Sequence, residues 1–149
     1  MRGYKLNIDV SYYDNGTGSV GAVLRNRRGE VKAGMACVVD HVLNGATAKA
    51  LALLKGLQFL ESVGCSSVII ESDSLELIQV CNGEIAVWSP YSAILAECFS
   101  KASMMEDVSF QHCMRDANQV AHQLAKHVYQ SKENLVWDGD PPGFILPYL

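Results

Sequence analysis

Long hydrophobic runs are absent from this sequence of 149 residues. No stretch approaches the roughly 20 apolar residues that a membrane-spanning helix needs, so we expect no contact with a membrane. The first strand-like pattern begins near residue 5, which leaves no room for a signal peptide. We therefore expect an intracellular protein, nuclear or cytoplasmic, and not a secreted one.

Paired cysteines are also missing, because the five cysteines are an odd number and include no C-x-x-C motif. This usage is typical of reduced thiols in an intracellular protein and argues against a disulfide framework. Cys113 lies near His112 and His122 along the chain, but the ligand spacing of a zinc site is absent. The cysteines therefore predict buried, unreactive thiols.

The sequence has no excess of basic charge, since 12 Lys and Arg stand against 16 Asp and Glu. A net charge of −4 is unfavourable for binding a phosphate backbone, unless basic residues gather locally. The composition, with 49% hydrophobic and 19% charged residues, excludes a disordered chain. We expect a single domain over residues 1–149, with an extended C-terminal tail from about 132 to 149.

The spacing of apolar residues predicts a mixed sheet flanked by helices. The predicted strands are 5–12, 20–24, 31–39, 68–70 and 108–114. The predicted helices are 46–62, 74–82, 89–104 and 116–130. The first three strands are joined by turns and the later ones by helices. The expected fold is therefore α/β, with three antiparallel and two parallel strands in a five-stranded sheet.

Two single aspartates lie just past apolar runs, and we expect Asp9 at the end of the first strand and Asp73 at the end of the fourth. If the two strands are neighbours, both carboxylates converge on one edge of the sheet. Hard divalent cations prefer anionic oxygen ligands, so such a pair is a candidate metal site. Either aspartate taken alone is better explained as a helix cap or turn residue, and the pairing gains weight from the surrounding motifs.

Several short motifs together cover almost the whole chain. They are residues 9–11 (D-V-S), 23–29 (V-L-R-N-R-R-G), 48–53 (A-K-A-L-A-L), 71–73 (E-S-D), 112–125 (H-C-M-R-D-A-N-Q-V-A-H-Q-L-A) and 136–142 (V-W-D-G-D-P-P). In this combination and order the chain resembles the ribonuclease H superfamily. Within it, the motifs are most similar to plant RNase H-like domains related to retroelement reverse transcriptases.

The resemblance implies a ribonuclease H-like fold and hydrolysis of the RNA strand of an RNA–DNA hybrid. An active member would use Mg²⁺ or Mn²⁺, and Asp9 and Asp73 match two of the family's metal ligands. His112 matches a mobile catalytic histidine of the family. The resemblance also places three residues near the nucleic acid, namely Ser11, Arg115 and Asn118.

The departures from the family pattern fall on two of its carboxylates and one glycine. Lys49 occupies the helix position of a catalytic glutamate, and residues 41–60 contain no Asp or Glu. His122 stands at the position of the last carboxylate, a change that many plant relatives share. Val10 replaces a glycine next to Asp9, which adds a side chain where backbone would approach substrate.

Two interpretations of Lys49 follow. Its ammonium group either substitutes for a metal ion beside Asp9 and Asp73, or extends into solvent and leaves a weak one-metal site completed by His122. We expect a pseudoenzyme that binds nucleic acid and retains weak or no catalysis, with no cofactor if it is inactive. The alternative is a non-catalytic interaction or dimerisation module, for which an exposed strand edge at 31–39 would offer a pairing surface.

Overall fold

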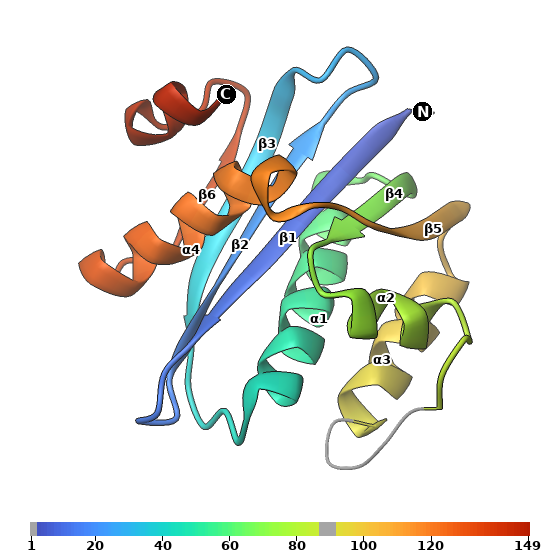
Figure 1. Ribbon diagram of the computed structural model, residues 1–149. Coiled ribbons are helices and arrows are strands. Elements are labelled where there is room, and N and C mark those ends of the chain that lie inside the picture. Colours follow the sequence, from blue (N-terminus) through green and yellow to red (C-terminus); the bar gives the residue numbers. More distant parts are fainter. Residues whose placement is uncertain (1–2, 87–91) are drawn as a thin grey trace.

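The computed structural model describes residues 3–86 and 92–149, and their centre is a sheet in the order β5-β4-β1-β2-β3-β6 (Figure 1). The strands are β1 (Tyr4–Tyr12), β2 (Gly18–Arg25), β3 (Val31–Val39), β4 (Ser67–Ser72), β5 (Asp107–His112) and β6 (Leu135–Asp138). Pairing is antiparallel from β1 through β2 and β3 to β6, and parallel from β1 through β4 to β5. The predicted mixed sheet and its strand directions are therefore confirmed.

The prediction of five strands is wrong, because the tail contributes β6. This strand is only four residues long and is followed by Pro141 and Pro142, so its pattern is too short to stand out in the sequence. It is held by the Trp137 ring, which packs directly on the backbone of Gly34. A short 3₁₀ helix, η2 (Gly143–Tyr148), follows and buries Ile145.

The edge of β3 is covered by the same tail. In addition to the β6 pairing, Val38 N donates to Asn134 Oδ1 at 2.9 Å, and Gly139 N donates to the carbonyl of Lys32 at 2.8 Å. The expectation of an exposed pairing edge at 31–39 is therefore wrong.

Helices lie on both faces of the sheet (Figure 1). They are α1 (Gly45–Val63), α2 (Leu75–Cys81), α3 (Ser92–Ser103) and α4 (Gln119–Ser131), with a 3₁₀ turn, η1 (Arg115–Asn118), leading into α4. The predicted start of the third helix, at residues 89–91, lies outside the described residues. Among the described residues, no helix is both long enough and apolar enough to cross a membrane.

Local sequence signals explain where the helices begin and end. The side chain of Asn44 accepts from Thr47 N at 2.8 Å and caps α1, which ends at Gly64 in the left-handed conformation with φ 72°. Ser74 caps α2 by accepting from Leu77 N at 3.3 Å, as its position after a strand predicts. These caps fix the starts of α1 and α2 near the carboxyl ends of β1 and β4.

The two faces of β1 carry different kinds of side chain. Leu6 and Ile8 face α1, where they pack against Gly56 and belong to the main core. Because strand side chains alternate, Asn7 and Asp9 face the side that α4 partly covers. The alternation therefore separates the core face from the face that carries the polar residues.

Candidate functional site

A cleft of about 410 Å³ lies just past the end of β4, beside residues 8–10 of β1, which continues to Tyr12. Its lining comes from β1, α1, the end of β4, the start of α2, η1 and α4. The lining residues are Ile8, Asp9, Val10, Lys49, Ala52, Ser72, Asp73, Ser74, Leu77, Arg115, Asn118, Gln119 and His122. The neighbouring parallel strands β1 and β4 thus bring Asp9 and Asp73 into one cavity, as required for a shared site.

Six of the residues predicted for the site line this cleft, namely Asp9, Lys49, Asp73, Arg115, Asn118 and His122. Two others do not belong to its lining. His112 is exposed, with Nε2 3.3 Å from the carbonyl oxygen of Asp73. Ser11 lies further along β1, half-buried.

Asp9 is bound to a histidine on the helix that faces it. Its Oδ2 lies 3.0 Å from Nδ1 of His122, and the Asp9 side chain is only 12% exposed. Burial and the charge of Asp73 raise the pKa of Asp9, and the contact with His122 opposes this rise. The charged form of Asp9 is therefore disfavoured in the cleft and depends on its histidine partner.

Lys49 is the cationic residue that α1 contributes to the cleft, and it is exposed. Within residues 3–86 and 92–149, its ammonium group makes no ion pair. Arg115 adds a second permanent positive charge to the lining. The cleft thus combines two carboxylates with two cations, so its formal charge is close to neutral.

The residues of the cleft do not fit a centre for two divalent cations. Such a centre needs several anionic oxygens, and the lining offers only Asp9 and Asp73 as carboxylates. In the described part of the chain, no group of three or more His, Cys, Asp and Glu side chains is arranged to hold a metal ion. Lys49 adds a positive charge to the same space, which opposes the binding of a cation.

A side-chain hydrogen bond of Asn118 connects the start of α4 to β1 beside the cleft. Asn118 is only 1% exposed, and its Nδ2 donates to the carbonyl of Ile8 at 2.8 Å. This bond ties the start of α4 to the β1 residue that precedes Asp9. The Oδ1 atom of Asn118 is buried and has no hydrogen-bond partner among the described residues.

A glycine determines how closely α4 approaches Asp9. Gly21 is the cross-strand partner of Asp9, and a Cβ atom there would lie 2.1 Å from the carbonyl oxygen of Ala121 and 2.8 Å from Ala125 N. Helix α4 therefore rests directly on the backbone of β2, which brings His122 to Asp9. The sequence offers no sign of this role, because the glycine stands within an ordinary apolar strand.

A family model described as reverse transcriptase-like matches residues 7–128 of this chain. The chain belongs to the reverse transcriptase-like family. No curated protein sequence matches this family member significantly.

Solved structures support the fold of this reverse transcriptase-like protein. RNase H1 from the archaeon Halobacterium salinarum is 20% identical, with a TM-score of 0.81, over 88% of this chain and 99% of its own. The N-terminal RNase H domain of a Mycobacterium tuberculosis protein is 20% identical, with a TM-score of 0.76, over 87% and 98%. LC11-RNase H1, isolated from compost by a metagenomic approach and solved in complex with an RNA/DNA hybrid, is 17% identical, with a TM-score of 0.78, over 87% and 99%. The predicted membership of the ribonuclease H superfamily is confirmed.

Proposed function

We propose that this protein binds nucleic acid, an RNA–DNA hybrid or RNA, in the cleft between β1, β4 and α4, and hydrolyses it weakly or not at all. The single observation that carries this proposal is the presence of Lys49 in one cavity with Asp9 and Asp73. The complex of LC11-RNase H1 with an RNA/DNA hybrid supports the choice of ligand.

The charges in the cleft favour a phosphate over a metal ion. Two unit charges about 4 Å apart near a protein surface interact with an energy of about 4 kcal/mol, and exposed charges that form no ion pair interact less strongly. The exposed ammonium of Lys49 therefore offsets part of the attraction that Asp9 and Asp73 would exert on a divalent cation. The guanidinium of Arg115 offers a second group that can contact a phosphate oxygen.

Asp9 is also less available to a cation than an isolated carboxylate would be. One of its oxygens is already in contact with His122, and its charged form is disfavoured by burial. The other interpretation, a weak one-metal site with Lys49 turned to solvent, requires that contact to open or His122 to serve as a ligand. The two interpretations predict different responses to metal.

A cleavage assay on a labelled RNA–DNA hybrid, run with Mg²⁺ and with Mn²⁺, separates them. We expect weak or no cleavage by the wild type, and clear activity only when carboxylates return in Lys49→Glu/His122→Asp. Lys55→Glu is the matched control, because it makes the same charge change on α1 outside the cleft lining. Wild-type cleavage that disappears in Asp9→Asn would contradict the loss of catalysis and support the one-metal site.

Binding is measured separately, by retardation of the same hybrid at low salt without divalent metal. We expect the wild type to bind and Arg115→Ala to bind more weakly, with an affinity that falls as salt rises. A wild type that neither binds nor cleaves the hybrid or RNA overturns the proposal. The non-catalytic interaction or dimerisation module then becomes the better account, and sedimentation of the purified chain tests whether it self-associates.

A further inference from the structure

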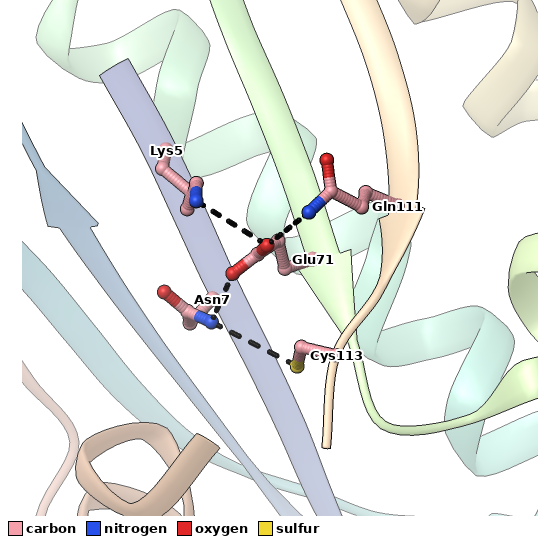
Figure 2. A network of polar contacts seen from close by, with 5 residues as sticks. All are labelled: Lys5, Asn7, Glu71, Gln111 and Cys113. Carbon is pink, nitrogen blue, oxygen red and sulfur yellow. Dashed lines mark hydrogen bonds and ion pairs between the residues drawn. The ribbon is translucent and has the colours of Figure 1, made fainter. Parts of the chain in front are cut away.

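A buried carboxylate that takes no part in the cleft lining lies just behind it. Glu71 is on β4, two residues before Asp73, and is only 6% exposed. Asn7 is on β1, two residues before Asp9, and is paired in register with Glu71. Figure 2 shows that the two side chains point toward each other.

Glu71 connects three strands through both of its oxygens (Figure 2). Its Oε1 accepts from Asn7 Nδ2 on β1 at 3.1 Å, and its Oε2 accepts from Gln111 Nε2 on β5 at 2.9 Å. The ammonium of Lys5, also on β1, lies 3.4 Å from Oε2. The buried charge is thus neutralised by a cation and hydrogen-bonded on both oxygens, as a buried carboxylate must be to be tolerated.

A carboxylate satisfies this arrangement with both neighbouring amides in the orientations observed. Asn7 and Gln111 both present amide donors to Glu71, from opposite sides. A glutamine in place of Glu71 would turn an NH₂ group toward one of these donors, because an amide has only one oxygen acceptor. A glutamine at position 71 therefore fits only if Asn7 or Gln111 reverses its amide, and a reversed Asn7 would also withdraw its Nδ2 from Cys113 Sγ, 4.0 Å away.

Each strand in the network leads directly into the cleft. Asp9 lies two residues after Asn7 on β1, and Asp73 lies two residues after Glu71, just past the end of β4. Beyond Gln111 the chain continues to Arg115 in η1. Past the network, Cys113 N donates to the carbonyl of Ser72 at 2.9 Å, which keeps the third segment beside β4.

We propose that Glu71 is the positioning residue of the cleft, which through Asn7 and Gln111 sets where Asp9, Asp73 and Arg115 lie relative to one another. Its effect on nucleic-acid affinity rests on the proposed function. Its effect on the geometry of the cleft does not, so the two are measured separately.

The test is Glu71→Gln, compared with the double variant Asn7→Asp/Glu71→Gln. The single change creates a donor–donor conflict unless Asn7 or Gln111 reverses its amide, whereas the double change restores one donor and one acceptor at the same contact. Ile70→Val is the matched control, because Ile70 is fully buried on the other face of the same strand and its loss of a methyl group weakens the core without touching the network.

Geometry is read from NMR, using the carboxyl ¹³C shifts of Asp9 and Asp73 and the ring ¹⁵N shifts of His122, beside urea unfolding of each variant. We expect these signals to move in Glu71→Gln and to return toward their wild-type positions in the double variant. In Ile70→Val the stability falls and the signals stay. If Glu71→Gln loses stability while all three sets of signals keep their wild-type positions, Glu71 only stabilises the fold and the inference is overturned.

Affinity for the labelled hybrid is the second readout. We expect Glu71→Gln to bind on the order of tenfold more weakly and the double variant to recover. Moved signals with unchanged affinity would overturn the functional part of the inference. A wild type that binds no nucleic acid refutes the proposed function instead, and the NMR comparison still decides the geometric part.

If Glu71→Gln does not fold, Gln111→Met replaces it, because Gln111 is exposed and its change removes only the donor from β5. Moved signals from Asp73 in that variant support the inference, and unmoved signals overturn it.

Discussion

Replacing Gly21 with alanine places a methyl group where helix α4 touches the sheet. The new Cβ would lie 2.1 Å from the carbonyl oxygen of Ala121, whereas ordinary contact begins at 3.4 Å. The helix must therefore retreat by roughly 1 Å, since both facing atoms are backbone and cannot rotate away. Overpacking of this kind costs about 1–3 kcal/mol of unfolding free energy. Each kcal/mol lowers the melting temperature by about 2–4 °C in a protein of this length.

The same displacement of α4 also changes the cleft, because His122 is on this helix. A shift of roughly 1 Å stretches its 3.0 Å contact with Asp9 beyond hydrogen-bond distance. Gly21→Ala should therefore lower the urea midpoint and also move the ring ¹⁵N signals of His122. Gly143→Ala is the control, since a Cβ there meets nothing within 4 Å, and we expect it to change stability by less than about 0.5 kcal/mol.

The reasoning would be refuted by a Gly21→Ala variant that unfolds at the wild-type urea concentration with unmoved His122 signals. In that case α4 does not rest on the backbone of β2. A variant that loses stability with unmoved His122 signals would show that the helix repacks without shifting the cleft, and the predicted link between Gly21 and Asp9 would fail.

Three further substitutions test other contacts. Gly34→Ala should displace the Trp137 ring, which would lie 2.1 Å from the new Cβ, and lower the free energy of unfolding by about 1–3 kcal/mol. Urea unfolding, followed by the backbone NMR signals of β6, checks this. Asn118→Ala should lower the free energy of unfolding by about 1–3 kcal/mol, because the buried carbonyl of Ile8 loses the donor on Asn118. A urea midpoint equal to that of the wild type would contradict this prediction. Asp9→Asn should stabilise the protein at pH 7, since burial raises the pKa of Asp9 and penalises its charged form in the folded state. That gain should shrink as pH falls through the raised pKa toward 3.8, and urea midpoints from pH 7 to 4 measure it.

The sequence by itself determined the fold class, because the strand and helix patterns are local. Alternating apolar residues identified the first three strands, and Ser74 marked the start of α2 correctly. Asp9, Asp73 and the motifs around them were enough to indicate the superfamily, although Asp9 lies within β1 and not at its end as expected. Because residues 41–60 contain no Asp or Glu, the sequence also predicted that Lys49 stands where the family has a catalytic carboxylate. The roles of these residues in binding or catalysis stay predictions.

Only the tertiary structure decided which residues meet. The sixth strand depends on Trp137 packing on Gly34, a contact between segments about a hundred positions apart that no local pattern encodes. In the same way, Asp9 meets His122 because α4 can rest on Gly21. Glu71 belongs to a short strand that lies between β1 and β5, strands far from each other in the sequence, so its partners are determined by register and not by sequence spacing. Local propensity therefore predicted the elements, and long-range packing decided the geometry of the site.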